Sequence, residues 1–556
     1  MVLWGKQGNE RITKVELENH EQKTEGTIMK RTGMMLVIIL AVGTTLSFSQ
    51  TKKEPYMEYG RESSCTTVAV GRKASADGSI ITAYTCDSGR TRGIFGLVEA
   101  KDHPAGAKVK LVQRIADNDK AMPAWKYKEV GTAPQVKHTY GYVNTAYPAM
   151  NEHQLALVES TIGYRKGLRA IDTGKIDCQM LYHLLLQRCK NARKAVKLAG
   201  ELLKRYGWND WGESIVIADK KEIWVMEIVG PGKGKVGAIW AAQRVPDDHV
   251  HVNGNGSRIR QINLDDPDNF MASDNIFKIA KEKGWWNPDE GPFEFCYAYA
   301  PNDRTSLGTR RREWGVFSLV APSLKLHPNS ENYPFSVKPD TLVTMEKVVE
   351  IYQSYYEGTP YDMTRDVKVE DDSGKLVISP FASPFLPGDM QKLLGVRRER
   401  TIPVKSCQFA YINQTRPWMP DEIGGVVWVD WDNPATSIYV PFYNSVTDIP
   451  ESYKVRARTN GYTRKSAWWA FNRLSGLLNQ KWGVFRHDYE KIFNPLQKQF
   501  FADQKEIDKK ALALFKEDPE KMRQFLTSYC IKCGNMAVKE AWKLGDSIWT
   551  KYDGKF

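Results

Sequence analysis

One stretch of the chain, Ser63–Ser88, constrains the fold more than any other. In it, Cys65 opens an apolar, β-branched run that ends at Gly71, an Asp-Gly pair follows at 77–78, and a second β-rich run covers 79–84. Two such runs joined through an Asp-Gly turn predict a β-hairpin with Cys65 at the tip of its first strand. A buried strand cysteine is one interpretation of that position, because cysteine is among the residues most often buried.

The residues in front of Cys65 allow a second interpretation. Ser63 and Ser64 are small and lie a short distance downstream of an export signal, so cleavage there would make Cys65 the mature amino terminus. One residue would then supply a thiol nucleophile and, in its own α-amino group, a base that titrates at about pH 8. The residues alone leave both interpretations open.

The export signal itself has three parts. A short basic region begins at Met29, an apolar run of 13 residues covers 34–46, and a small-x-small cleavage site stands at 47–49. This order is typical of a signal peptide, here 29–49, and the apolar run is too short to span a bilayer. We therefore expect export to the periplasm or outside the cell, with no stable membrane anchor.

Composition narrows the classes of function. The chain has 556 residues, of which 42% are hydrophobic and 26% charged, a globular composition with enough length for a large core. The net charge of +13 is spread without a long Lys/Arg block, so a mildly basic surface is expected and no nucleic-acid partner. Eight cysteines are too few for a disulfide scaffold, and the C-x-x-C at 530–533 lacks a second ligand pair. Structural thiols or one disulfide are expected, and no metal.

Hydrophobic patterning predicts sheet layers with helices on their outer faces. A helix capped by Asp177 is expected to end at Gly207, and from about Thr463 the pattern is helical, with Asp518 and Pro519 as a cap and first-turn pair. The expected strands are 138–147, 155–161, 213–218, 222–228, 237–245, 408–413, 426–430 and 437–440.

The segment 65–79, CTTVAVGRKASADGS, resembles the opening of the C69 family of dipeptidases, which are cysteine-type amino-terminal-nucleophile (Ntn) hydrolases. Further similarity to this family occurs at Arg244–His249, Thr309–Trp314 and Pro441–Tyr443 and continues to about residue 550. The resemblance implies an α+β fold, a four-layer αββα Ntn-hydrolase sandwich with a helical C-terminal region. In the family, the cysteine is exposed by removal of everything that precedes it.

The resemblance and the signal peptide together predict the organisation of the chain. Residues 1–28 are polar and are interpreted as an over-extended start, and 50–64 as a propeptide. The Ntn-hydrolase catalytic domain is expected at 65–460, and a helical C-terminal region packed on it at 461–556. A homo-oligomer supported by these helices is left open.

The resemblance assigns the reacting groups to the first hairpin. Cys65 would be the nucleophile, and Asp87 would hydrogen-bond its ammonium or thiol group and orient it. Family members often carry an arginine three positions before this aspartate, where it would help to hold the thiolate. This chain has Tyr84 there, which puts thiolate stabilisation in doubt.

Further roles fall on asparagines and arginines that lie later in the chain. By resemblance, Asn151 and Asn255 would donate to the oxyanion, with Asn253 as the substitute if the register is off by two. A turn asparagine and a flexible glycine-flanked loop are the competing interpretations. Either Arg310 or Arg311 would lie near the nucleophile and bind substrate, and a basic surface turn is the alternative.

The predicted function is that of an exported dipeptidase that cleaves short peptides through a thioester acyl-enzyme, without a cofactor. Two alternatives remain. One is an Ntn acylase on non-peptide amides, of the penicillin V or bile-salt type, because those enzymes share the Cys-first fold. The other is a catalytically silent secreted binding protein that uses an aromatic cleft, since the chain has 17 tryptophans and 25 tyrosines.

Overall fold

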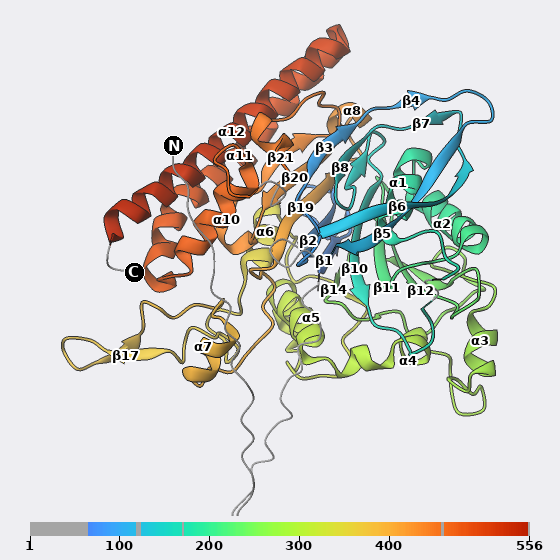
Figure 1. Ribbon diagram of the computed structural model, residues 1–556, viewed down its shortest axis with the longest axis horizontal. Helices are drawn as coiled ribbons and strands as arrows, with labels where there is room; N and C mark the ends of the chain where they lie inside the picture. Colours follow the sequence, from blue (N-terminus) through green and yellow to red (C-terminus); the bar gives the residue numbers. More distant parts are fainter. Residues whose placement is uncertain (1–64, 118–123, 170–171, 457–460, 554–556) are drawn as a thin grey trace, which may run out of the picture. The chain divides into compact units, whose positions relative to one another are not determined.

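The computed structural model describes residues 65–117, 124–169, 172–456 and 461–553. The expected over-extended start, signal peptide and propeptide lie outside these residues. Within them, helices and strands are mixed and the C-terminal region is helical, so the predicted α+β class is confirmed at this level (Figure 1).

The first of two large antiparallel sheets contains the predicted hairpin. Its seven strands follow the order β16-β14-β1-β2-β19-β20-β21. Every residue of β1, β2 and β19 is buried, as expected of strands covered on both faces. The strands are β1 (Thr66–Val70), β2 (Ile80–Asp87), β14 (Val250–Asn253), β16 (Ser336–Val337), β19 (Cys407–Thr415), β20 (Gly425–Trp431) and β21 (Val440–Tyr443).

The second large sheet has eight strands in the order β15-β13-β12-β11-β10-β9-β8-β3. These strands are β3 (Phe95–Val98), β8 (Tyr142–Thr145), β9 (Met150–Asn151), β10 (Ala156–Ile162), β11 (Gly212–Ala218), β12 (Ile223–Val229), β13 (Ile239–Val245) and β15 (Phe270–Ala272). Three two-stranded ribbons accompany the sheets: β4 (Lys101–Asp102) with β7 (His138–Thr139), β5 (Lys108–Asp117) with β6 (Ala124–Pro134), and β17 (Lys368–Glu370) with β18 (Leu376–Ile378).

The two large sheets face each other through β2 and β19 on one side and β10 on the other. The Tyr411 hydroxyl of β19 donates to the Leu157 carbonyl of β10 at 3.0 Å. The Tyr84 hydroxyl of β2 donates to the Glu159 carboxylate of β10 at 2.7 Å. Side chains of the first hairpin therefore reach the second sheet.

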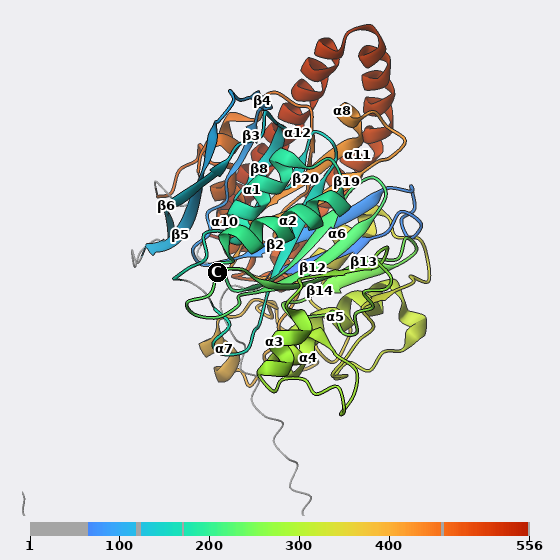
Figure 2. The same cartoon turned by 90° about the vertical axis from the view of Figure 1, so that its right-hand side faces the viewer.

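Helices α1 (Cys178–Arg188) and α2 (Ala192–Tyr206) cover the eight-stranded sheet (Figure 2). The second packs on β11 and β12, and the first contacts β9 and the ribbon strands β5 and β7. Asp177 caps the first helix and Gly207 ends the second, as predicted. The sequence pattern predicted one helix here. The structure has two, because the Asn191 side chain accepts from the Lys194 amide and begins a new helix.

The C-terminal helices pack on the seven-stranded sheet. They are α10 (Ala467–Leu478), α11 (Trp482–Glu517) and α12 (Pro519–Tyr552), and the last two form the antiparallel pair drawn in red in Figure 1. Asp518 caps α12 with Pro519 in its first turn, as predicted. The remaining helices are α3 (Ile276–Glu282), α4 (Phe295–Tyr299), α5 (Leu307–Val320), α6 (Met345–Gln353), α7 (Gly388–Leu393), α8 (Asp421–Gly424) and α9 (Glu451–Lys454), with 3₁₀ turns at Pro301–Thr305, Pro322–Leu324 and Pro434–Thr436.

All eight cysteines lie in the described residues as buried free thiols, so no disulfide closes a loop. Among the described helices, none has a stretch long and apolar enough to cross a bilayer.

Candidate active site

The position of Cys65 follows from the register of the first hairpin. Thr67 of β1 lies opposite Tyr84 of β2, and Cys65 precedes Thr67 by two residues. Because side chains alternate along a strand, Cys65 and Tyr84 project from the same face of the sheet. That face meets β10, so the thiol lies between the two sheets, and the residue is only 6% exposed.

The sulfur of Cys65 has two oxygen neighbours. Its Sγ lies 3.5 Å from Glu159 Oε1 and 3.6 Å from Tyr84 Oη. Burial raises the pKa of the Cys65 thiol well above its ordinary value, and the Glu159 carboxylate raises it further. At neutral pH the resting sulfur is therefore a thiol. Sequence reasoning noted Tyr84 but missed Glu159, whose place depends on how the second sheet packs.

The main chain of Cys65 is held separately from its sulfur. The Arg312 guanidinium on α5 donates through Nη1 to the Cys65 carbonyl at 2.8 Å and to Thr66 Oγ1 at 2.9 Å. Its Nη2 donates to the Gly254 carbonyl at 2.5 Å. Burial and the neighbouring Arg400 lower the pKa of Arg312 to about 9. One buried arginine thus ties the beginning of β1 to the loop after β14.

Arg312 is a residue that the sequence analysis missed, since only its two neighbours were singled out. Arg310 donates to the carbonyls of Asn329 and Ser330, each at 2.7 Å. Arg311 forms a buried ion pair with Glu399 at 3.1 Å. Both expected arginines are therefore bound to groups other than Cys65, and it is Arg312, the third residue of the same run, that contacts Cys65.

Asp87 ends β2 and is 1% exposed. Its Oδ2 accepts from the Arg400 guanidinium at 2.5 Å and from Thr85 Oγ1 at 3.5 Å, and that hydroxyl accepts from the Thr66 amide at 3.0 Å. Burial raises the pKa of Asp87, while Arg400 and Arg312 offset part of that shift. Its buried Oδ1 has no hydrogen-bond partner among the described residues. Asp87 thus lies beside the beginning of β1 with one acceptor atom open.

Asn255 lies in the same neighbourhood. Its backbone amide donates to Ser160 Oγ at 3.1 Å, and that hydroxyl donates to the Cys65 carbonyl at 3.2 Å. The Asn255 side chain donates to the Thr161 carbonyl at 2.7 Å, and its buried Oδ1 has no partner among the described residues.

The loop that carries Asn255 is closely packed, unlike the flexible loop that was the alternative interpretation. Asn255 has a φ of 72°, in the left-handed region. A Cβ at Gly254 would lie 2.8 Å from the Thr309 carbonyl, and one at Gly256 would overlap the Arg304 guanidinium. The Asn253 side chain is used inside the turn, where it accepts from the amides of residues 255 and 256. The two glycines therefore permit close packing against α5.

Asn151 is placed differently from the expectation. Its side-chain amide donates to the Leu186 and Cys189 carbonyls at 2.9 and 2.8 Å, where α1 ends. Its Oδ1 accepts from the amides of His153 and Leu155, each at 3.0 Å. Both amide hydrogens are therefore engaged at the end of a helix, and none of these bonds leads to Cys65.

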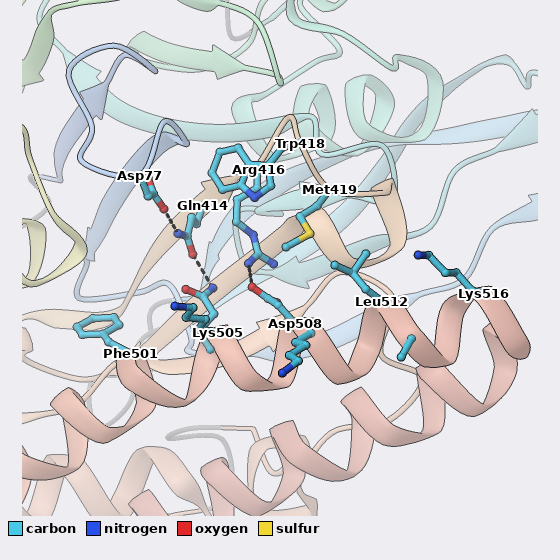
Figure 3. Close-up of a pocket in the computed structure, with 13 residues that line it drawn as sticks. Asp77, Gln414, Arg416, Trp418, Met419, Phe501, Lys505, Asp508, Leu512 and Lys516 are labelled. Atoms are coloured by element: carbon cyan, nitrogen blue, oxygen red, sulfur yellow. Dashed lines mark hydrogen bonds and ion pairs between the residues drawn. The ribbon is translucent and has the colours of Figure 1, made fainter.

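Two cavities lie near the strand ends. One, of about 590 Å³, is lined by Gln414, Arg416 and the side of α11, at the turn end of the β1–β2 hairpin, opposite Cys65. Its polar groups bind one another: Gln414 contacts Asp77 and Gln504, and Arg416 pairs with Asp508 (Figure 3).

The other cavity, of about 530 Å³, lies between the β5–β6 ribbon, α1 and the loop that follows Asp87. Arg90, Trp125 and His183 are among its lining residues. Tyr147 follows the lining residue Ala146 in the chain, and its ring lies 5.9 Å from that of Tyr84. This cavity is therefore on the side of the molecule that carries Asp87.

These features define a mixed α+β protein with a buried, hydrogen-bonded thiol at the beginning of its first strand. The chain belongs to peptidase family C69, which matches residues 64–494. It is 27% identical over 451 residues to a "Probable dipeptidase" of Latilactobacillus sakei, covering 78% of this chain and 85% of that protein. It is 26% identical over 430 residues to "Dipeptidase A" of Lactobacillus helveticus, covering 75% and 82%. The resemblance drawn from the first hairpin is confirmed.

Proposed function

We propose that the protein is an exported dipeptidase whose mature chain begins at Cys65 and folds as an Ntn-hydrolase sandwich. The observation that carries the proposal is the placement of Cys65, whose carbonyl is fixed by Arg312 and Ser160 while its sulfur faces Tyr84 and Glu159. Membership of a peptidase family and the names of the relatives support the peptide substrate. Export rests on the signal-peptide pattern at 29–49.

In the proposed reaction, the free α-amino group of Cys65 takes the thiol proton as the sulfur attacks the scissile carbonyl carbon. The same proton passes to the leaving amine, and the C–N bond breaks to leave a thioester. Water then attacks the thioester and releases the acid. Asp87, with its open Oδ1, is the partner proposed for the α-ammonium group.

The oxyanion donor proposed for this reaction is Asn255. Its backbone amide donates to the Ser160 hydroxyl, which in turn donates to the Cys65 carbonyl. A preorganised amide donor at such a site typically contributes about 3 kcal/mol to transition-state stabilisation. No oxyanion role is proposed for Asn151, whose amide hydrogens are engaged at the end of α1.

The test is hydrolysis of a panel of dipeptides by the exported protein, alongside penicillin V and a bile-salt amide. We expect dipeptide turnover that is absent in Cys65→Ala and largely kept in Cys86→Ala, a neighbouring buried thiol on β2. Turnover of the non-peptide amides alone would favour the acylase alternative. Turnover of neither class by correctly processed protein would favour a binding protein.

A further inference from the structure

The groups that the Cys65 sulfur contacts are acidic: a phenol hydroxyl and a carboxyl group. In the described part of the chain, the hydrogen bonds of Sγ go to Tyr84 Oη and Glu159 Oε1. Tyr84 itself donates to Glu159 Oε1 at 2.7 Å, so both hydroxyl and thiol hydrogens point at one carboxylate oxygen. The guanidinium of Arg312 contacts the Cys65 carbonyl instead.

Glu159 has a second carboxyl group as its neighbour. Glu213 of β11 lies opposite Thr161, two residues beyond Glu159, so the two carboxyls share one face of the sheet. Thr161 Oγ1 donates to Glu213 Oε1 at 3.1 Å. Two buried carboxyls in contact do not both ionise. Burial and Glu159 raise the pKa of Glu213 well above its ordinary value, whereas hydrogen bonds from Glu213, Tyr84 and Cys65 offset part of the rise at Glu159. Glu159 is therefore the more acidic carboxyl of the pair.

Other titratable groups also act on this centre, but from neighbouring elements. Arg114 of β5 favours the charged form of Glu159, and it is itself bound to Asp177 and Asp210. Further groups of the described residues that interact electrostatically with Cys65 or Glu159 are Cys86 and Asp87 of β2, Tyr147, Cys178 and Tyr182 of α1, Arg312 of α5, Tyr352 of α6 and Tyr411 of β19.

We propose that Glu159 is the positioning residue of the nucleophile: its carboxylate, fixed by the Tyr84 hydroxyl, accepts the thiol hydrogen of Cys65 and keeps the sulfur neutral and oriented. The inference rests on the proposed function for its role in catalysis. During attack the thiol proton goes to the α-amino group, as above, and Glu159 neither gains nor loses a proton. By resemblance, Tyr84 thus stands where family members often carry an arginine, and its hydroxyl brings no positive charge to the sulfur.

The test is the pH dependence of alkylation of Cys65 by iodoacetamide, measured by mass spectrometry on processed protein. Glu159→Gln removes the negative charge 3.5 Å from the sulfur, so the midpoint of alkylation should move to lower pH. A shift of one pH unit raises the alkylation rate at pH 7 about tenfold. An unchanged midpoint in folded Glu159→Gln protein overturns the proposal.

Two further variants keep the test decisive. Glu213→Gln replaces a protonated carboxyl by a neutral amide of similar shape, so its midpoint should stay at the wild-type value. Tyr84→Phe removes the hydroxyl that contacts the sulfur and lowers the pKa of the Cys65 thiol, so its midpoint should move to higher pH. This variant decides if Glu159→Gln does not fold. A downward shift in Tyr84→Phe, or equal shifts in both Glu→Gln variants, overturns the proposal.

The result is separable from the proposed peptidase activity, since alkylation needs no substrate. The expected shifts in a protein that hydrolyses no dipeptide would support the role of Glu159 and remove the proposed function. Dipeptide hydrolysis with no shift in any variant would support the proposed function and remove the role of Glu159.

Discussion

Arg312 and Arg310 stand two positions apart on α5, yet only the first touches the beginning of β1. We expect Arg312→Ala to lower kcat/KM on the order of 10²-fold, because the Cys65 carbonyl and Thr66 hydroxyl lose a charged donor in a buried site. Lysine should not restore activity, since it lacks the planar fork that reaches three oxygens at once. Steady-state kinetics on dipeptides check this.

The matched control is Arg310→Ala, which removes bonds to carbonyls of the 329–330 loop. Its kcat/KM should stay within about threefold of wild type, as expected of a packing contact away from the reacting atoms. A loss as large as that of Arg312→Ala would mean that Arg310 serves the substrate, as the resemblance implied.

Asn151 is expected to act on stability rather than on turnover. Asn151→Ala leaves the buried Leu186 and Cys189 carbonyls without their donors, so unfolding free energy should fall by about 2–4 kcal/mol. Urea unfolding measures this, and kcat per folded molecule should be little changed. An unchanged urea midpoint with a kcat loss on the order of 10² would return Asn151 to the oxyanion site.

At the scale of single residues, the sequence was informative where contacts are local. The proximity of Cys65 and Tyr84 follows from the hairpin register, because 19 residues separate them. Glu159 and Arg312 are 94 and 247 residues from Cys65, and they reach it through sheet-to-sheet and helix-to-strand packing. No periodicity specifies such a contact, which is why the neighbouring arginines were chosen instead.

At the scale of elements, β14 carries a buried histidine that should make stability depend on pH. His251 lies opposite Ala69, and its Nδ1 contacts the Phe335 carbonyl at 2.7 Å. Burial, with a smaller effect of Arg258, lowers the pKa of His251 from 6.5 to about 3. The unfolded chain binds the proton more readily, so this stability is present above pH 6.5 and is lost as the pH falls toward about 3.

Between pH 7 and pH 5 this single site should remove about 2 kcal/mol of unfolding free energy. His251→Asn keeps a side-chain N–H near the position of Nδ1 but cannot titrate. Urea unfolding at both pH values should therefore show a smaller loss in the variant than in the wild-type protein. Equal losses would mean that His251 is protonated in the folded state.

The helices and strands themselves were largely predictable, and the exceptions have local causes. Alternating apolar runs placed β10 to β13 within a few residues, and Asp518–Pro519 marked the boundary between α11 and α12. The region from Asp177 to Gly207 keeps one apolar stripe through both helices, so the break at Asn191 was invisible to periodicity. The break depends on the Asn191 cap and on Asn151 of β9, whose side chain donates to the Leu186 carbonyl near the end of α1.

At the scale of the whole molecule, the arrangement of layers depends on contacts that a linear pattern cannot specify. The sequence predicted sheets with helices outside, but the order of strands in each sheet joins segments far apart, such as β2 with β19. The position of Cys65 between the sheets is a product of that order. The contacts of Cys65 therefore depend on the complete fold, and the proposed mechanism also depends on removal of the chain that precedes it.

The last prediction concerns that preceding chain. If Cys65 supplies both nucleophile and base, active protein must begin at Cys65, because an amide nitrogen in place of the α-amino group accepts no proton. The open Oδ1 of Asp87 provides a buried acceptor for the ammonium group. In the precursor, which has no ammonium group at Cys65, this oxygen would be left unpaired. Intact-mass analysis of active protein should show a chain that starts at Cys65. Cys65→Ala distinguishes the route: accumulation of the precursor indicates self-cleavage, and normal trimming indicates another protease. Full activity in a species that retains 50–64 would rule out the amino-terminal mechanism.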